Sequence, residues 1–584
     1  MGDELRMTNG TTRTDRWAAL AFGTFVGFCF WLPPERCGAA EEGDYPVSPA
    51  LKITPTPARG AKVYRRTRPQ LVRSMDGSGN NSDHPAMGAA FTPLLRRVPP
   101  DYADRISALA GPARPGPREI SVMVSAQPDL VDNEQGLSDF FWQWGQFLDH
   151  DLDLVGGVSP PEPAHIEVPD GDPSFDPDVT GTIEMQFNRS NYHKRTGNNQ
   201  RNPREQLNEI TAWIDASNVY GSDRARAAAL RTADGTGRLR TSAGDLLPFN
   251  TAGLPNAGGD DPGLFLAGDV RANEQVGLTA MHTLFVREHN RLAELIAEAR
   301  PEASGDEIYQ QARRIVGAQM QIVTYNEFLP VLLGQDALEP YQGYDPGVDA
   351  RIANVFATAA YRFGHSALSP VLLRLDAEGK EIDAGHLPLR DAFFAPWRII
   401  QEGGIDPLLR GLAHQVCQRV DPYVVEEVRN FLFGAPGAGG FDLVSLNLQR
   451  GRDHGLPGYN DTRAALGLTR AESFSDVSSD PEIQARLAAT YPDPDSIDLW
   501  IGGLAEDPWH DAQVGELFFT ILKEQFEVLR DGDRFWHELT LSDTELLEVR
   551  QTRLSDIIRR NTDIDDEIRD DVFHARADRG RRHR

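Results

Sequence analysis

The chain has 584 residues, of which 40% are hydrophobic and 25% are charged, an ordinary composition for a soluble globular protein of one large domain or several domains. The formal net charge of −28 argues against nucleic acid as a partner and for high solubility. Three cysteines are too few for a disulfide framework and form no Cys-x-x-Cys motif, so only a Cys37–Cys417 pair is left as a possible bridge.

The start of the chain has the features of an export signal. Trp17 to Leu32 is an apolar run preceded by arginines, shorter than the roughly 20 residues of a membrane span. Small residues at 38–40 could be a cleavage site. We expect residues 1–40 to be a signal peptide, or alternatively an uncleaved membrane anchor, and the protein to be secreted, periplasmic or extracellular. Residues 41–63, rich in Pro, Ala and Glu, are predicted to be a linker.

The stretch from Asp139 to Leu154 is apolar enough to form a buried helix, yet it is crowded with polar groups. Five of them lie within about two turns: Gln146, Asp149, His150, Asp151 and Asp153. At helical spacing all but Asp151 share one face, and Asp151 points about 100° away from His150. Desolvating a carboxylate costs several kcal/mol, so buried helices rarely carry unpaired charges. We interpret this helix as one that holds bound groups on two sides.

The segment from Thr211 to Ser217 offers oxygen atoms at alternate positions. The donors are the side chains of Thr211, Asp215 and Ser217 and the carbonyl of Trp213. Ca²⁺ takes roughly six to eight oxygen ligands at about 2.3–2.6 Å. Alone, such a segment is usually an ordinary turn. Asp151, which faces away from His150, could supply another carboxylate, and this makes calcium the preferred interpretation.

The rest of the chain predicts a mostly helical domain. Helical patterns occur at four places: Leu278–Ala299, 306–333, 347–362 and 421–432. The sequence has no run of alternating strands, internal repeat or second composition regime. We predict the fold class as mainly α, a single large helical domain over residues 64–573 with long loops and little β-structure. A basic disordered tail is expected at 574–584.

Polar motifs flank these helices. Within Gly268–Gln275, Arg271 and Glu274 are spaced i, i+3, so they could reach one site together or form a surface ion pair at a helix start. His365 comes just after a helical pattern. Leu446–Asn460 follows a Gly-rich turn and contains further polar residues.

Five segments together resemble the animal-type haem peroxidases, the superfamily of myeloperoxidase, lactoperoxidase and peroxidasin. They are Gly145–Asp151, Thr211–Tyr220, Gly268–Arg271 with Glu274, Arg362–His365 and Leu446–Arg450. The resemblance runs from about Tyr64 to about Thr562 in the same motif order. The scarcity of cysteine differs from the vertebrate enzymes and is similar to the bacterial members.

The resemblance implies a haem b with His365 as the proximal iron ligand. Asn447 matches the residue that accepts a hydrogen bond from the second ring nitrogen of this histidine, which makes the ligand more basic. Arg450 matches a residue that meets a haem propionate. On the opposite side, His150 would take a proton from hydrogen peroxide and return it to the leaving oxygen. Arg271 would stabilise the charge that develops as the O–O bond breaks.

Further positions follow from the same resemblance. Gln146 would position water or a halide, and Asp149 and Glu274 match the carboxylates that form ester links to haem methyl groups. An ester carries no charge to desolvate, which accounts for carboxylates in a buried pocket. Asp151 with the segment 211–217 matches the calcium site of the family. Gln275 stands where myeloperoxidase has the methionine of its sulfonium link, so that link is not expected.

The implied function is a peroxidase that uses hydrogen peroxide to oxidise small donors through a haem oxidised by two electrons. Without the sulfonium link, efficient chloride oxidation is in doubt, and bromide, iodide, thiocyanate and small aromatic donors are favoured. A role in the response to oxidative stress is expected. We assign no role to three further histidines, His282, His289 and His454, which are most simply core or surface residues.

Two alternatives remain from other classes. The first is a fatty-acid dioxygenase of the cyclooxygenase-like branch, which uses a tyrosyl radical three residues before the proximal histidine. Here that position is Arg362, and Tyr361 is one residue too early. The second is an exported calcium-binding adhesion protein with a degenerate haem pocket. The joint presence of the predicted catalytic and haem-binding residues argues against it.

Overall fold

The computed structural model describes residues 72–575. The predicted signal segment, the linker, residues 64–71 and the last residues of the tail, 576–584, lie outside the described residues, as do Cys29 and Cys37. The described chain is mainly helical, which confirms the predicted fold class.

Helices account for most of the regular structure. In the first half of the domain the α-helices are α2 (Pro117–Met123), α3 (Phe140–Leu152), α4 (Ser217–Tyr220), α5 (Arg224–Leu230), α6 (Val276–Ala299) and α7 (Gly305–Val323). A π-helical turn, η2 (Thr324–Phe328), continues α7 into α8 (Leu329–Leu333), and α9 (Asn354–Thr358) is followed by the 3-10 helix η3 (Ala360–His365).

The second half contains the remaining helices. They are α10 (Trp397–Gln401), α11 (Asp406–His414), α12 (Glu426–Arg429), α13 (Leu443–Asp453), α14 (Tyr459–Ala465), α15 (Pro481–Thr490), α16 (Leu499–Ala505), α17 (Glu516–Asp531), α18 (His537–Thr540), α19 (Asp543–Gln551) and α20 (Leu554–Asn561). Short 3-10 turns lie at η4 (Leu389–Asp391), η5 (Phe474–Asp476) and η6 (Pro494–Ser496).

Strands are confined to three short antiparallel pairs within the described chain. They are β1 (Thr92–Pro93) with β4 (Leu207–Asn208), β2 (Ile166–Glu167) with β3 (Glu184–Met185), and β5 (Val371–Leu372) with β6 (Leu387–Pro388). Each pair has only two residues per strand, so the sheets fasten loops and do not form a layer of the fold.

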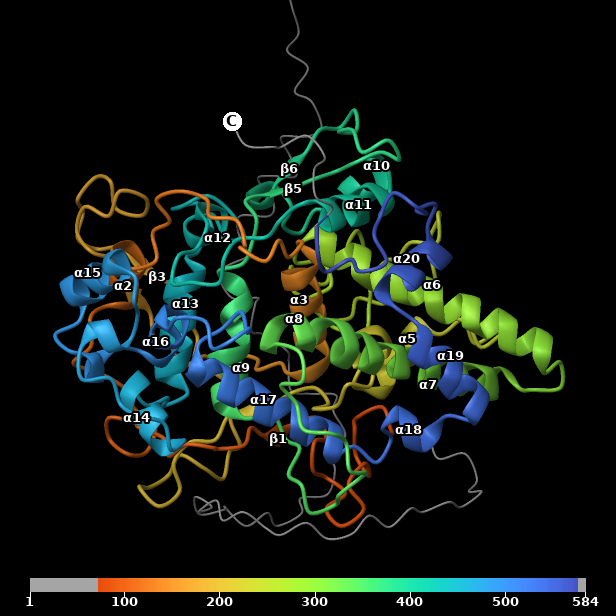
Figure 1. Ribbon diagram of the computed structural model, residues 1–584, viewed down its shortest axis with the longest axis horizontal. Coiled ribbons are helices and arrows are strands. Elements are labelled where there is room, and N and C mark those ends of the chain that lie inside the picture. The colour runs from red at the N-terminus through yellow and green to blue at the C-terminus, as the bar shows by residue number, and fades with distance from the viewer. Residues whose placement is uncertain (1–71, 576–584) are drawn as a thin grey trace, which may run out of the picture.

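Helix α3 lies at the centre of the domain, with α6 and α7 on one side and α13 and α16 on the other (Figure 1). It contacts α4, α6, α11 and η3. Its aromatic side chains are buried in the main hydrophobic core, and the ring centroids of Phe147 and Phe285 of α6 are 5.0 Å apart. This packing supplies the apolar burial that fixes the position of α3.

Two predicted helices are shorter than expected. In the pattern at 347–362 the α-helix covers only Asn354–Thr358, because the residues before it follow Pro346-Gly347 and pair as extended chain, with Ala353 bridging Leu95. In the pattern at 421–432 the helix covers only Glu426–Arg429, since Pro422 precedes it and Val424 bridges Ala126. Tertiary pairing overrides helical periodicity at both sites.

The ends of the described chain are attached to the domain. His574, where the tail was expected to begin, bridges Leu137, and the Ala575 N–H donates to the Gly136 carbonyl. Cys417 is buried and unpaired. Between residues 72 and 575 no helix is both long and apolar enough to cross a membrane.

Candidate active site

His150 lies on α3 in a buried position, with 3% of its surface exposed. Its Nδ1 is 3.6 Å from Asp269 Oδ1, too far for a good hydrogen bond, and has no other partner among the described residues. Burial, and then the positive charge of Arg271, lower the pKa of His150 well below 6.5, although Asp269 opposes this. The imidazole is therefore neutral at physiological pH and can accept a proton.

Arg271 is held beside His150 by the carboxylate of Asp269. Its Nε donates to Asp269 Oδ1 at 2.9 Å and its Nη2 to Asp269 Oδ2 at 3.0 Å, a bidentate pair. Nη2 also donates to the Asp153 carbonyl at 2.8 Å. Burial alone would raise the pKa of Asp269, but Arg271 and His150 outweigh it and lower that pKa. The guanidinium is thus a fixed cation next to a neutral base.

Three further carboxyl groups surround this arginine. Burial raises the pKa of Asp149 and of Asp153, against the lowering effect of Arg271 and Arg362. It also raises the pKa of Glu274 to about 7. Arg271 Nη1 is 3.4 Å from Asp149 Oδ2, and 27% of the Asp149 side chain is exposed. The structure therefore brings Asp149 and Glu274 together around Arg271 as carboxyls whose pKa values are raised by burial.

Amide groups fill the space between α3 and the start of α6. Gln275 Nε2 donates to Gln143 Oε1 at 2.7 Å and to Gln146 Oε1 at 3.1 Å, and Gln146 Nε2 donates to Glu274 at 3.3 Å. A Cβ atom on Gly277 would lie 2.6 Å from Gln143 Oε1, so a larger residue there would displace the amide of Gln143. Gln146 is thus held between Gln275 and Glu274.

The other predicted histidine, His365, ends η3. Its Nδ1 is 2.7 Å from Asn447 Nδ2, and Asn447 Oδ1 accepts from Arg362 Nη1 at 2.8 Å. In this arrangement the amide nitrogen of Asn447 faces His365, whereas the expected contact was an amide oxygen. The reason is Arg362, which can only donate and therefore holds the oxygen. Burial and then Arg362 lower the pKa of His365 to about 3, so its imidazole is neutral at physiological pH.

Arg450 lies one turn after Asn447 on α13, so the two side chains share a face of the helix. Its Nη1 donates to Ser190 Oγ at 2.6 Å and to the Asn188 carbonyl at 3.2 Å, and it is 3.3 Å from Asp453 Oδ2. Burial lowers the pKa of Arg450 to about 10. Arg450 is thus a buried cation on the His365 side of the site.

Asp151 points away from His150 and meets the segment 211–217. Its carboxylate accepts from the backbone N–H of Asp215 at 3.0 Å and from Ser217 Oγ at 2.8 Å. Thr211 Oγ1 donates to Asp215 Oδ1 at 3.1 Å, and Asp215 Oδ2 is buried without a partner. The Trp213 indole N–H donates to the Gly77 carbonyl. The predicted calcium residues thus lie together, on the side of α3 away from His150.

Asp151 and Asp215 are buried carboxyl groups that repel each other when both are charged. Burial and then the neighbouring Asp215 raise the pKa of Asp151 to about 7. A cation between the two carboxylates would remove their repulsion. No set of three or more His, Cys, Asp or Glu able to hold a metal occurs between residues 72 and 575. A calcium ion here would therefore depend on hydroxyl and carbonyl oxygens as well.

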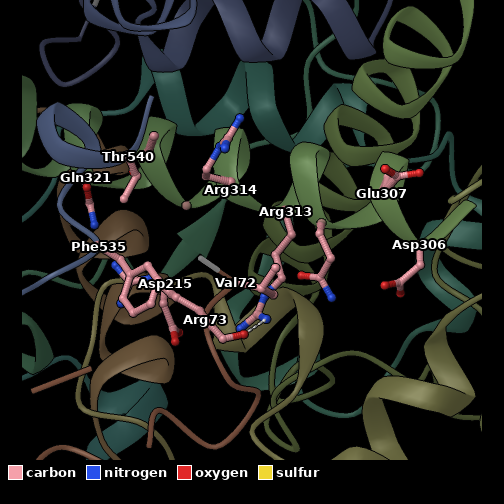
Figure 2. A pocket seen from close by; sticks show the side chains of 13 residues that line it. Val72, Arg73, Asp215, Asp306, Glu307, Arg313, Arg314, Gln321, Phe535 and Thr540 are labelled. Atoms are coloured by element: carbon pink, nitrogen blue, oxygen red, sulfur yellow. Dashed lines mark hydrogen bonds between the residues drawn. The ribbon is translucent and has the colours of Figure 1, made fainter. Parts of the chain in front are cut away.

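A cavity of about 290 Å³ opens beside Asp215, between α7 and the start of the described chain (Figure 2). Arg73 and Arg313 lie next to each other near Asp215, and Asp306 and Glu307 lie on the other side of the cavity. No residue predicted to hold haem lines it. The cavity therefore adjoins the predicted calcium segment and is separate from the two histidines.

Over most of its length the chain is similar to known peroxidases. The chain is 40% identical over 526 residues to thyroid peroxidase from Sus scrofa, covering 80% of this chain and 56% of that protein. It thus spans about half the length of that relative. The structure of peroxidase A from Dictyostelium discoideum superposes with a TM-score of 0.81 at 35% identity, covering 87% of this chain and 100% of that chain.

A more distant likeness concerns the fold alone. The structure of a fatty acid alpha-dioxygenase from Arabidopsis thaliana superposes with a TM-score of 0.73 at 20% identity, covering 86% of this chain and 83% of that chain. The fold is therefore one that peroxidases and dioxygenases share. Residues 72–573 match the family model for animal haem peroxidase. The chain belongs to the animal haem peroxidase family.

The residues present fit the haem that the family implies. His365 is neutral and partly exposed, and a Cβ atom on the adjacent Gly364 would meet nothing within 4 Å, so there is open space beside the histidine. Gly145, Gln146 and Asp149 are likewise the partly exposed positions of α3. Arg362 and Arg450 provide positive charge suited to carboxylates. These features match an iron ligand, a flat group and its propionates.

Sequence reasoning missed several residues of this site. They are Gln143, Asp269, His282 and Arg362. Asp269 stands two residues before Arg271 in the same motif, and Arg362 stands three before His365, so motif position was the available signal. His282 is fully buried, with its ring 5.0 Å from that of Phe147, and it interacts electrostatically with Asp269 and Arg271. His282 therefore lies close to Asp269 and Arg271, and its sequence position alone predicts no role for it.

Proposed function

We propose that this protein is a haem-dependent peroxidase. It would use hydrogen peroxide to oxidise bromide, iodide, thiocyanate or small aromatic donors. The observation that carries the proposal is the neutral His150 beside Arg271, with Arg271 fixed by a bidentate pair to Asp269. Family membership supplies the cofactor. When bound, haem provides the iron centre that binds peroxide and passes two oxidising equivalents to the donor.

The residues of α3 and the loop before α6 divide the proton and charge chemistry between them. His150 is uncharged and accepts the peroxide proton, which it then returns to the departing oxygen as water forms. Arg271 cannot lose its proton, so it presents fixed N–H donors to the developing negative charge. Because Asp269 and the Asp153 carbonyl already hold the guanidinium, little reorganisation is needed when this charge appears.

His365, Asn447 and Arg450 would hold the cofactor from the other side. The neutral His365 is in the protonation state needed for an iron ligand. Coordination through Nε2 requires the proton on Nδ1, and Asn447 would then turn its amide oxygen toward that proton. Arg362 would correspondingly turn toward Asp149 or Asp153, which already interact with it electrostatically.

The amide cluster around Gln275 supports the choice of donor. Gln275 occupies the position of the sulfonium-forming methionine and is engaged with Gln143 and Gln146. A sulfonium link is therefore not part of this proposal, and bromide, iodide, thiocyanate and phenols remain the favoured donors. Asp149 and Glu274, whose carboxyls tend to be neutral, are the proposed ester positions.

The dioxygenase alternative is not favoured by the local structure. Three residues before His365 stands Arg362, which donates to Asn447. Tyr361 is stacked on Phe356 with ring centroids 4.7 Å apart and packs against Phe526. A radical residue of the cyclooxygenase-like kind is not at the required position.

Calcium binding and export complete the proposal. Asp151, Thr211, Trp213, Asp215 and Ser217 are the proposed calcium ligands, supported by the unpartnered Asp215 Oδ2. Export rests on the apolar run Trp17–Leu32, and a bacterial source rests on the scarcity of cysteine. N-terminal sequencing of the mature protein, followed by fractionation, separates a cleaved signal peptide from an anchor.

The function is tested on haem-reconstituted protein with peroxide-driven bromide and iodide assays. Wild type should turn over both halides, and His150→Ala should lower the rate of the peroxide reaction about 10²–10⁴-fold. His289→Ala is a matched control, a buried histidine of α6 that hydrogen-bonds Tyr220 and lies away from Arg271. Equal activity of His150→Ala and wild type would contradict the proposal. Acid–butanone extraction then reports whether the ester links form.

A further inference from the structure

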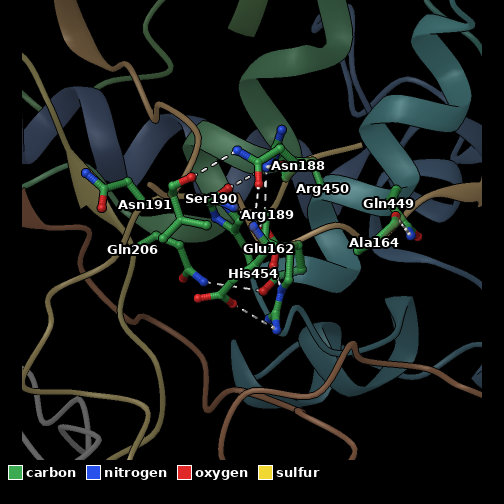
Figure 3. Close-up of polar contacts among 12 residues, drawn as sticks. Glu162, Ala164, Asn188, Arg189, Ser190, Asn191, Gln206, Gln449, Arg450 and His454 are labelled. Atoms are coloured by element: carbon green, nitrogen blue, oxygen red, sulfur yellow. Dashed lines mark hydrogen bonds and ion pairs between the residues drawn. The ribbon is translucent and has the colours of Figure 1, made fainter. Parts of the chain in front are cut away.

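A chain of buried hydrogen bonds runs from Arg450 through Ser190 to His454 (Figure 3) and continues to α9, the helix before η3. Arg450 Nη1 lies 2.6 Å from Ser190 Oγ, and Ser190 Oγ lies 2.7 Å from His454 Nε2. His454 Nδ1 lies 2.9 Å from Asn354 Oδ1, at the start of α9. Ser190 and His454 are fully buried. The chain joins three segments that are far apart in the sequence.

The Asn354 end of this chain fixes the direction of its bonds. Asn354 Oδ1 can only accept, so His454 carries its proton on Nδ1, and Thr358 Oγ1, 3.0 Å from the same nitrogen, can accept from it as well. His454 Nε2 therefore accepts from the Ser190 hydroxyl. Arg450 can only donate, and Ser190 Oγ accepts from it through a lone pair. Burial also lowers the pKa of His454 well below 6.5, so the ring is neutral.

The Ser190–His454–Asn354 order is like that of a nucleophile, a base and an orienting group, but the structure excludes that role. All three residues are buried, so no substrate can reach Ser190. The Ser190 oxygen also accepts from a cationic arginine, which makes it less nucleophilic. A network of this kind serves to hold a side chain in place.

The side chain that the network holds is the guanidinium of Arg450. Asp453 Oδ2 lies 3.3 Å from Arg450 Nη1 and also accepts from the Ser190 N–H at 2.7 Å, so Ser190 contacts both members of this ion pair. The guanidinium also lies 4.2 Å from the ring of Phe187. These contacts restrict the orientation of the guanidinium.

We propose that Ser190 and His454 are positioning residues that set the guanidinium of Arg450 for a carboxylate of the bound cofactor. The inference rests on the proposed function, because it takes haem as the ligand. Asn447 and Arg450 share a face of α13, so the network places Arg450 on the same side as the His365 contact. Through Asn354 at the start of α9, it also joins Arg450 to the helix that precedes η3, the element that carries His365.

The test compares haemin with haemin dimethyl ester, which lacks free carboxylates. Apo wild type and variants are titrated by Soret absorbance without peroxide. Ser190→Ala should weaken haemin binding about tenfold, the usual size for a hydrogen bond to a charged group, and should leave the dimethyl ester little affected. His454→Phe should act in the same direction with a smaller change. Ser445→Ala is the matched control, because Ser445 is also a buried serine but lies on α13. It should change the affinity for neither haemin nor the dimethyl ester.

A double-mutant cycle with Arg450→Gln tests whether the effect passes through Arg450. If it does, Ser190→Ala should cause no further loss of haemin affinity once Arg450 is replaced. Equal losses for both porphyrins, or additive losses in the cycle, would overturn the inference.

The titration also distinguishes a failure of the proposed function from a failure of the positioning proposal. If wild type binds neither porphyrin, the haem assignment falls, and the same cycle is run on urea unfolding of the apo protein. Non-additive effects of Ser190→Ala and Arg450→Gln would then support the positioning link. Additive effects would refute it.

Discussion

The two sides of the candidate active site are held by different forces. On the His150 side an ion pair dominates, in which both carboxylate oxygens of Asp269 accept from Arg271. On the His365 side, neutral groups make the direct contacts, and Asn447 bridges the histidine to Arg362. Charge fixes one side, and hydrogen-bond geometry fixes the other.

Because of this difference, we expect the residues that react with peroxide to be distinct from those that retain the cofactor. A charged pair holds its geometry without reorganising when new charge develops nearby, which suits proton transfer and bond cleavage. A neutral histidine with an amide partner suits a metal ligand, whose basicity is adjusted by one hydrogen bond. Substitutions should therefore divide by side, with loss of the peroxide reaction for one and loss of haem for the other.

The largest expected effect comes from removing the ligand itself. His365→Ala should lower halide turnover by at least about 100-fold and shift the Soret band, because the substitution removes the only proposed protein bond to iron. It should also release haem on gel filtration from any protein in which the proposed ester links have not formed. The measurement is the Soret spectrum before and after gel filtration, with turnover per haem. His414→Ala, a partly buried histidine of α11, is the control. A Soret spectrum and turnover equal to wild type would place the ligand elsewhere.

Asp269→Asn is the corresponding test on the His150 side. The change keeps the shape but removes the charge that fixes Arg271, so the peroxide reaction should slow about 100-fold while haem retention stays near wild type. Stopped-flow mixing with peroxide measures the first quantity and gel filtration the second. A parallel loss of both would remove the proposed separation of the two sides.

The positions of residues on α3 were predictable from the sequence, but the residues that contact them from other elements were not. Helical spacing alone placed Asp151 and His150 on different faces of α3, and the structure has Asp151 against Asp215. It could not identify Asp269 as the partner of Arg271, since periodicity describes one element and not which elements meet. Nor could it give the orientation of the Asn447 amide, which depends on Arg362 donating to it.

The fold class was predictable because the helices that form the centre are long and strongly patterned. Leu278–Ala299 was expected as a helix, and α6 runs from Val276 to Ala299. The shorter elements near His365 were not predictable in their extent. Residues before Asn354 pair with Leu95 across the domain, and such long-range pairing is invisible to local periodicity.

Removing calcium is a milder test of whether the peroxide reaction and haem retention depend on different residues. Chelation with EDTA should lower the thermal midpoint by several degrees and slow the peroxide reaction about tenfold, because Asp151 and Asp215 would then repel each other behind His150. Haem retention should change less. Readdition of Ca²⁺ should restore both values in wild type but not in Asp151→Asn. Full recovery by Mg²⁺ would contradict a site built for calcium.

The smallest effect on turnover is expected at Asp139, at the start of α3. Burial raises its pKa to about 7 from 3.8, with Ser369 donating to it at 2.7 Å. A carboxyl whose pKa is raised by folding favours the folded state fully at low pH, and this contribution is lost as pH rises from about 4 to about 7. Asp139→Asn cannot ionise, so it should be more stable than wild type at pH 8, by about 2–4 kcal/mol, and nearer to wild type at pH 5.

Urea unfolding at the two pH values measures this difference, and the exposed Asp178→Asn serves as control. Turnover should stay close to wild type, because Asp139 lies at the opposite end of α3 from His150. A loss of stability at pH 8 would mean that the carboxylate at this helix start stabilises the fold as Asp269 does. The charge effects of α3 would then extend along its whole length and would not be confined to the His150 end.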